Sequence, residues 1–297
     1  MHPDNQIIHS LWIGKELSPL ELLTIYSFIA NGHKFYLWIY ESIETPLPQK
    51  VILKDANEII PYSKVFKYKF ANQYGHGKGS YAGFSDLFRY ALLYQYGGWW
   101  VDMDVTCLKP FDIKEPYVFR SHHELKVVGN IIKCPPKSEL MQNCYKDALF
   151  LIDEHNRNWN RPIEILNRNI VELNLESYIR SFTNPDKWLI IKKYLVNQWD
   201  IPEHYYAIHW VNEEWRRHKI AKNKTIANSF YASLLKKYNV SFIHVKGLQL
   251  INYKIKLTNL YSAMVLLKYP HVFFKTLLRF IIRHNKKIIN QFNSDIN

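Results

Sequence analysis

The feature that most constrains the fold is a helical segment followed directly by a buried strand. In residues 81–96, apolar side chains recur at steps of three and four, the period of a helix with one buried face. Glycines at 97–98 are expected to end that helix, and the apolar run at 99–101 then has strand character. A helix that passes through two glycines into a buried strand predicts an α/β fold.

Two aspartates follow this strand and predict a metal and ligand site. Residues two apart in an extended strand point to the same face, so Asp102 and Asp104 are expected to project together. Unpaired charges beside buried tryptophans are costly, and a bound divalent cation would remove that cost. Ligands of open α/β sheets bind at the carboxyl ends of strands, where these carboxylates would lie. An Asp-X-Asp pair alone also occurs in solvated turns, so its neighbours decide its meaning.

Composition indicates a folded protein with an anionic partner. The chain has 297 residues, of which 47% are hydrophobic and 15% aromatic, enough for one large α/β domain or two small ones. The formal net charge is +13. Such an excess favours a nucleotide diphosphate, an anionic membrane surface or nucleic acid as partner.

Cysteine usage and the N-terminal residues predict a cytoplasmic location. Cys107, Cys134 and Cys144 form an odd set without a Cys-X-X-Cys motif, which is typical of reduced, packed thiols. Residues 1–6 lack the basic and apolar regions of a signal peptide. No uninterrupted apolar run approaches the ~20 residues of a membrane span.

The remaining elements follow from local patterns. Ser18-Pro19-Leu20-Glu21 is a capping box with proline at the first helical position, and Gly32 fits the end of the helix it begins. Residues 157–199 suggest several short helices, and residues 212–217 a charged turn that contains Trp215. Further strands are expected at 6–13, 34–40, 51–53, 117–120, 127–133, 205–210 and 240–245, and further helices at 138–154 and 225–238.

The glycine-rich segment 75–80 predicts a flexible loop near the ligand. It lacks the spacing of a Walker phosphate loop, and no clear apolar strand precedes it.

We divide the chain into one catalytic domain over residues 1–260 and a basic C-terminal tail over residues 261–297. The tail contains a candidate helix beginning near Pro270, with an apolar face and cationic side chains every four residues on another face. Two interpretations stay open. The helix lies in an anionic membrane interface, or it packs on the domain with its lysines solvated.

The pattern around the aspartates resembles a known family. Ser-Asp-X-X-Arg at 85–89, Gly-Gly at 97–98 and aromatic-X-Asp-X-Asp at 100–104 are similar to the sugar-binding region of glycosyltransferase family 32. That family includes yeast-type mannosyltransferases and bacterial capsule and O-antigen enzymes, and the large clostridial glucosylating toxins share its core. Residues 7–14 resemble the family's opening strand, and the resemblance extends to about residue 215.

The resemblance implies a GT-A fold, a Rossmann-like α/β domain with a mixed central sheet and helical insertions. It implies a retaining transfer of sugar from a nucleotide-sugar donor, with UDP-sugars preferred and GDP-sugars possible, to a saccharide acceptor. The expected cofactor is Mn²⁺ or Mg²⁺, because carboxylate and diphosphate oxygens suit such ions. No carboxylate of the sequence stands out as a covalent nucleophile.

The resemblance also implies roles for single residues. Asp104 would bind the metal directly, and Asp102 would contact ribose or metal-bound water. Asp86 would accept sugar hydroxyls, and Arg89 would pair with Asp86 or bind sugar oxygens. Trp12 would stack on the nucleobase. Trp100 and Asn130 are further donor-site candidates.

His209 lies in a segment that resembles the family's C-terminal histidine motif, with Trp215 six residues later. It is expected as a third metal ligand or a diphosphate contact. The sequence departs from the family at Glu213 and Glu214, where small residues or serine are usual. Either acid could replace His209 as a ligand, and each would repel a diphosphate unless it faces the metal or solvent.

We expect a cytoplasmic enzyme of bacterial capsule, O-antigen or lipopolysaccharide synthesis. Its acceptor would be lipid-linked, and the tail 261–297 would hold it at the inner face of the membrane. Two other classes stay open. A nucleic-acid-binding protein would explain the net charge of +13 but has no recognised motif. A Mg²⁺-dependent phosphohydrolase would use the same carboxylates but leaves Trp12, Asp86 and Arg89 unexplained.

Overall fold

A computed structural model of the protein describes Met1 and residues 5–257. The tail at residues 261–297 lies outside the described residues, so its helix and its membrane contact stay predictions.

A seven-stranded mixed sheet forms the centre of the molecule, with strand order β3-β2-β1-β4-β7-β6-β8. The first four strands are parallel to one another, whereas β7 runs antiparallel to both β4 and β6, and β8 is parallel to β6. This is the mixed sheet that the resemblance implied. The strands are β1 (Ile7–Trp12), β2 (Lys34–Ile39), β3 (Val51–Asp55), β4 (Gly98–Val101), β6 (Val118–His122), β7 (Lys126–Cys134) and β8 (Ile179–Arg180).

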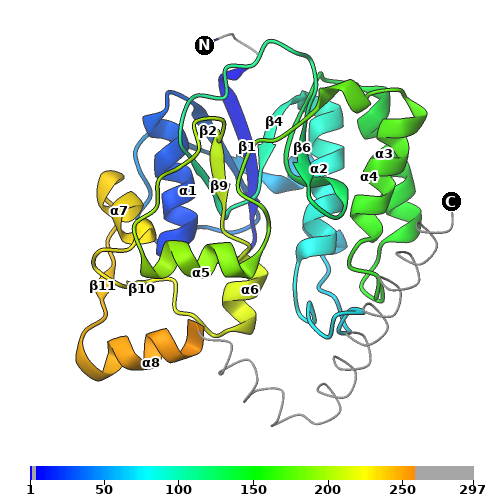
Figure 1. The fold of residues 1–297 in the computed structure, drawn as a ribbon. Helices are drawn as coiled ribbons and strands as arrows, with labels where there is room; N and C mark the ends of the chain where they lie inside the picture. The colour runs from blue at the N-terminus through cyan, green and yellow to red at the C-terminus, as the bar shows by residue number, and fades with distance from the viewer. Residues whose placement is uncertain (2–4, 258–297) are drawn as a thin grey trace, which may run out of the picture.

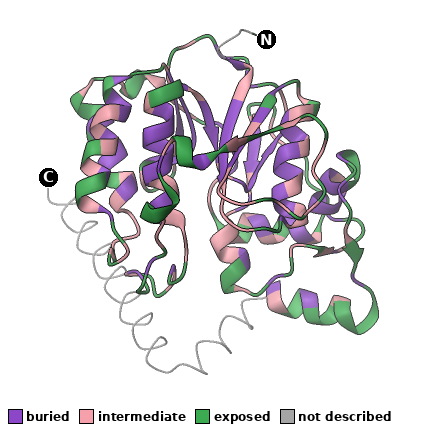
Figure 2. Ribbon diagram, turned by 180° about the vertical axis from the view of Figure 1, so that it is seen from behind, coloured by how far each residue is buried: buried purple, intermediate pink, exposed green. Residues whose placement is uncertain are grey.

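Helices cover both faces of the sheet (Figure 1). Helices α2 (Ala82–Tyr96), α3 (Glu139–Leu151) and α4 (Arg161–Glu172) lie on one side, and α1 (Pro19–Ala30) lies on the other. Successive side chains of β4 point to opposite faces of the sheet. Trp100 therefore packs into the apolar cluster beneath α2 to α4, and Trp99 packs into the cluster beneath α1. Both tryptophans are at most 1% exposed. Figure 2 shows the buried residues concentrated along the sheet and on the inner helix faces.

A third apolar cluster unites the segments after residue 187, around the buried Trp210 and Trp215. Strand β9 pairs antiparallel with β5, and β10 pairs parallel with β11, so two small sheets stand beside the main one. The elements here are β5 (Val105–Cys107), α5 (Trp188–Val196), β9 (Ala207–His209), α6 (Asn212–Arg217), β10 (Lys224–Thr225), α7 (Phe230–Lys237), β11 (Ile243–His244) and α8 (Gly247–Leu257). Short 3₁₀ turns η2 (Ala56–Glu58), η3 (Tyr62–Lys64) and η4 (Glu176–Tyr178) complete the described elements.

Local chemistry explains where the first helix begins and ends. The Ser18 side chain accepts the Leu20 backbone N–H, and the Glu21 side chain accepts the Ser18 backbone N–H, so the capping box is confirmed. Gly32 follows the C-cap with φ +86°, a conformation that favours glycine. The cysteines are confirmed as buried free thiols. No helix among the described residues is both long and apolar enough to span a bilayer.

Four local predictions need correction. Strand β4 ends at Val101, so Asp102 and Asp104 lie in the turn between β4 and β5 and not on an extended strand. Residues 212–217 form helix α6 and not a turn, because Trp215 packs into the third cluster. The helix expected at 225–238 begins only at Phe230, where Ser229 caps it, and the strand expected at 240–245 is reduced to Ile243–His244.

Candidate active site

A pocket of about 580 Å³ lies beyond the carboxyl ends of β1 and β4. Strand β1 contributes Trp12, the β4–β5 turn contributes both aspartates, and α2, β7 and α6 form other walls. The structure brings every site residue expected from the sequence to this pocket: Trp12, Asp86, Arg89, Trp100, Asp102, Asp104, Asn130 and His209. Their roles in binding or catalysis stay predictions.

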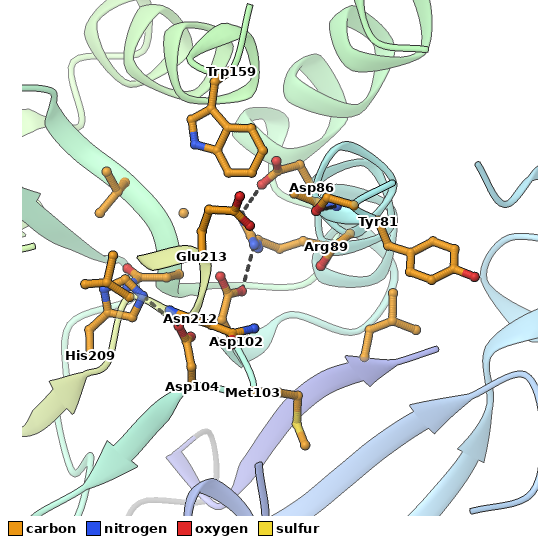
Figure 3. Close-up of a pocket in the computed structure, with 18 of the residues that line it drawn as sticks. Tyr81, Asp86, Arg89, Asp102, Met103, Asp104, Trp159, His209, Asn212 and Glu213 are labelled. Carbon is orange, nitrogen blue, oxygen red and sulfur yellow. Dashed lines mark hydrogen bonds and ion pairs between the residues drawn. The ribbon is translucent and has the colours of Figure 1, made fainter. Parts of the chain in front are cut away.

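Arg89 connects two acidic residues on one side of the pocket (Figure 3). Its Nη1 lies 2.6 Å from Asp86 Oδ1, one helical turn away, and its Nη2 lies 2.7 Å from Asp102 Oδ1. The Trp100 indole N–H also donates to Asp102 Oδ1, at 2.7 Å. Arg89 is only 4% exposed, so this ion-pair network is fixed by packing as well as by charge. Burial raises the pKa of Asp86 to about 6, although the Arg89 guanidinium opposes that shift.

A second network places His209 between two carboxylates. His209 Nε2 lies 3.3 Å from Asp104 Oδ2, and Nδ1 lies 2.7 Å from Asp186 Oδ1. Asp186 in turn pairs with the buried Arg120, whose Nη2 is 2.5 Å away. Pairing of β5 with β9 sets this geometry, since Val105, next to Asp104, lies opposite His209.

These contacts raise the pKa of His209 and lower the pKa values of the two aspartates. Burial alone would lower the pKa of His209, but Asp186 and Asp104 outweigh it and raise the pKa to about 10. Burial would raise the pKa of Asp104, but the His209 imidazolium and the Asn212 backbone N–H hold it below its usual range. The pKa of Asp186 is likewise held far below its usual range by His209 and Arg120, against the effect of burial. The two carboxylates therefore favour the imidazolium form of His209.

The two aspartates of the motif fit a hard divalent cation. Within the described residues, the contacts of Asp102 all use Oδ1 and those of Asp104 all use Oδ2, so each carboxylate keeps one oxygen for a ligand. His209 fits only after losing its Nε2 proton, with Asp186 then orienting the ring through Nδ1. Across Met1 and residues 5–257, no three His, Cys, Asp or Glu side chains form a ready-made metal cluster.

Two buried N–H donors in the pocket lack a protein acceptor among the described residues. They are the Trp12 indole Nε1 and the Asn130 amide Nδ2. Asn130 is oriented from its other side, because Arg120 Nη1 donates to its Oδ1 at 3.3 Å. Buried donors are almost always satisfied in proteins, so these two are available to a ligand in the pocket.

Sequence reasoning missed several residues of the pocket. Asp186 lines the pocket and Arg120 pairs with it from behind, and neither belongs to a local motif that would have revealed it. Trp159 and His122 also line the pocket, from the segment after α3 and from the end of β6. The backbone N–H of Asn212 donates to Asp104 Oδ2 at 2.7 Å, a contact that no side-chain pattern could predict.

The two acids that depart from the family pattern, Glu213 and Glu214, pair with different arginines. Glu213 lines the pocket and is neutralised by Arg216, whose Nη2 lies 2.8 Å away. Glu214 pairs instead with Arg217, at 2.6 Å. The segment 75–80 is confirmed as a loop, and Arg216 Nη1 donates to the Lys78 carbonyl at 3.3 Å across the pocket rim.

Residues 33–120 match the sequence model of a family described as a glycosyltransferase sugar-binding region containing a DXD motif. This match confirms the resemblance noted above. The matched segment carries Asp86, Arg89, Asp102 and Asp104, and the α/β domain has the mixed central sheet that the resemblance implied.

Among solved structures, the chain is similar to one described as "PaToxG Glycosyltransferase", with a TM-score of 0.42, 14% identity, and coverage of 58% of this chain and 73% of the other. It is also similar to a transferase mutant, with a TM-score of 0.39, 10% identity, and coverage of 59% and 86%. A search of curated proteins gave no match.

Proposed function

We propose that the protein is a metal-dependent glycosyltransferase that moves a sugar from a nucleotide-sugar donor to a saccharide acceptor. One observation carries the proposal: Asp102 and Asp104 line the same pocket as Asp86, Arg89 and Trp12, at the carboxyl ends of β1 and β4. A rival phosphohydrolase has no use for the last three residues, whereas a donor with a base, a diphosphate and a sugar would occupy the whole pocket.

The carboxylates would bind the donor's charged centre. The free oxygens of Asp102 and Asp104 would hold Mn²⁺ or Mg²⁺, and such an ion stabilises the charge that develops on the leaving diphosphate. Asp86, held by Arg89, would accept hydroxyls of the transferred sugar. Trp12 would stack on the base, and the free N–H of Asn130 would donate to the sugar or the acceptor.

His209 would act on the same diphosphate from the opposite wall. As a cation it would pair with diphosphate oxygens, and as a neutral ligand it would present Nε2 to the metal. Asp186 supports both states, because it accepts from Nδ1 at 2.7 Å and so fixes the ring.

We further propose that transfer proceeds with retention, giving an α-linkage from an α-linked donor. The step would go by front-face attack, with the leaving phosphate accepting the proton of the attacking hydroxyl. UDP-sugars are preferred over GDP-sugars. These points rest on the family resemblance.

The pathway proposal rests on the resemblance and on charge. A net charge of +13 favours an enzyme at an anionic surface, where a lipid-linked acceptor is found. We propose a cytoplasmic enzyme of capsule, O-antigen or lipopolysaccharide synthesis, attached peripherally to the membrane through the tail at residues 261–297.

A thermal-shift screen of nucleoside diphosphates with and without Mn²⁺ tests donor binding, because a ligand that binds only the folded state raises the melting temperature. We expect a shift for one nucleotide that requires both Mn²⁺ and Asp104, and its loss in Asp104→Ala. Asp147→Ala, at a surface ion pair with Arg168, is the matched control.

Transfer itself is tested with UDP- and GDP-sugars, Mn²⁺ and lipid-linked saccharides. Release of phosphate without an acceptor would favour the phosphohydrolase, and salt-dependent binding of RNA without a nucleotide shift would favour nucleic-acid binding. Full activity in Asp104→Ala would remove Asp104 from the mechanism.

A further inference from the structure

Helix α8 has a second apolar face that stays exposed among the described residues of the chain. Its inner face carries Tyr253 and Leu257, which are buried in the third apolar cluster. On the opposite face, Leu248, Ile251 and Ile255 are 84%, 56% and 43% exposed. Their spacing of three and four residues makes them one continuous stripe, which we call the α8 strip.

Cationic side chains border the strip. Lys254 and Lys256 lie on its two sides, since each is about 90° or more around the helix from the centre of the strip at 100° per residue. Beside the helix is a cavity of about 140 Å³, lined by Lys219, Lys224 and Lys256 together with the buried Tyr253. We call this cavity the lysine pocket.

The strip and the lysine pocket fit the two parts of one ligand. A cavity walled by three lysines from separate segments concentrates positive charge and suits a phosphate group. An apolar strip edged by lysines is typical of helices that lie in the interface of an anionic membrane. Nucleic acid would pair with the lysines but would leave Leu248, Ile251 and Ile255 in water.

The position of α8 links this surface to the active site. Lys256 Nζ donates to the Lys219 carbonyl at 3.4 Å, two residues after α6 ends. Helix α6 in turn carries Asn212 and Glu213 of the active-site pocket. Figure 1 shows α8 beside α6, at the end of the molecule toward which the parallel strands run.

We propose that the α8 strip and the lysine pocket together bind anionic phospholipid, with the strip against the acyl region and a headgroup phosphate in the lysine pocket. This surface is distinct from the tail at residues 261–297. It does not depend on the proposed reaction, because binding to vesicles is measured without donor or metal.

The test is co-sedimentation of the full chain with vesicles of phosphatidylcholine alone and with 30% phosphatidylglycerol. We expect strong binding only to the anionic vesicles. Leu248→Ser combined with Ile251→Ser should weaken it at least about tenfold, since two exposed apolar side chains lose their burial in lipid. The matched control is Leu149→Ser combined with Leu189→Ser, at residues that are 56% and 59% exposed on α3 and α5.

A charge series tests the lysine pocket separately. Lys224→Ala combined with Lys256→Ala should weaken binding about fivefold for each lysine, because each cation near an anionic surface contributes about 1 kcal/mol. Lys50→Ala combined with Lys64→Ala, at exposed lysines elsewhere, should change binding much less.

Three outcomes would overturn the proposal. One is vesicle binding by the Leu248→Ser, Ile251→Ser variant that is as strong as that of the parent. That result would assign any membrane contact to another segment, such as the tail. Another is equal binding to neutral and anionic vesicles. The last is equal losses in the variants and their matched controls. Each variant's melting temperature should stay within about 2 °C of the parent, since the replaced side chains are on the surface.

Discussion

Arg89 Nη2 lies 2.7 Å from Asp102 Oδ1, so helix α2 holds the first aspartate of the DXD motif in place. Asp102 lies outside any strand, and its carboxylate is oriented by this ion pair and by the Trp100 indole N–H. The same guanidinium reaches Asp86 at 2.6 Å, so one buried cation positions two acids of the pocket. Removing one partner of such a buried network leaves an uncompensated charge, which is costly.

Gly129→Ala should displace Arg89. A Cβ at residue 129 would lie 2.1 Å from Arg89 Nη1, closer than any allowed contact. Arg89 is 4% exposed and paired with two carboxylates, so its guanidinium can move away from the new methyl group only by breaking these ion pairs. We expect the free energy of unfolding to fall by about 3 kcal/mol, as for a broken buried ion pair, together with a loss of donor-induced thermal shift. Urea denaturation measures the first effect.

A double-mutant cycle separates this cause from a general effect of the extra methyl group. In an Arg89→Met background the clashing guanidinium is absent, so Gly129→Ala should cost much less there. Additive losses in the double variant would show that Gly129 acts independently of Arg89.

Asp186→Asn should lower the pKa of His209. The carboxylate that accepts from Nδ1 at 2.7 Å is one of two that stabilise the imidazolium, so its loss favours the neutral ring. NMR titration of His209 measures the shift directly. Mn²⁺ affinity or transfer should fall about 10- to 100-fold, as for other partners that orient a ligand histidine.

Stability must be followed in parallel, because Arg120 is 1% exposed and also pairs with Asp186. For this reason the titration of His209 is the diagnostic measurement. An unchanged His209 pKa in Asp186→Asn would contradict the geometry. Asp147→Asn, at the surface pair with Arg168, should leave the titration as in the parent.

Gly97→Ala should be far more damaging than Gly98→Ala. Both glycines have positive φ, at +62° and +79°, so alanine costs about 1–2 kcal/mol of backbone strain at either position. At Gly97 the new Cβ would also lie 2.3 Å from the Pro136 backbone nitrogen, whereas at Gly98 its nearest neighbour is 3.8 Å away. We expect a loss above about 4 kcal/mol for Gly97→Ala alone. Equal melting temperatures for the two variants would refute this packing.

Acid should destabilise the protein through His33. Burial lowers the pKa of His33 from 6.5 to about 4, although the carbonyl of Asn5 and the charge of Asp112 oppose that shift. Its Nδ1 contacts the Asn5 carbonyl at 2.9 Å, and its Nε2 accepts the Phe111 backbone N–H at 3.0 Å, so the folded protein holds the neutral ring.

The unfolded chain takes up this proton below pH 6.5, and the folded protein resists until about pH 4. Stability should therefore fall as the pH drops through this window, by about 3 kcal/mol in total from this residue. Urea denaturation between pH 7 and pH 4.5 measures the slope. His33→Gln should flatten the slope in part, because the buried His9, whose pKa is lowered to about 3, contributes in the same direction.

The helix and strand positions followed closely from local patterns. The capping box at Ser18, the period of residues 82–96 and the apolar run before Asp102 each depend on side chains within one or two turns of each other. The prediction was wrong where distant packing decides local structure. Trp215 draws residues 212–217 into a helix, because its ring is buried against a cluster whose other members were not visible from that segment.

The sequence by itself determined the class of fold, the DXD segment and the identity of the candidate donor-site residues, because those signals are local or belong to a compact motif. Only the tertiary structure placed Asp186 and Arg120 behind His209 and turned the backbone N–H of Asn212 toward Asp104. The physical reason is the pairing of β5 with β9, which sets Val105 opposite His209 across about a hundred residues of chain. Such a register depends on the packing of the whole domain, so no local sequence pattern in the paired residues predicts it.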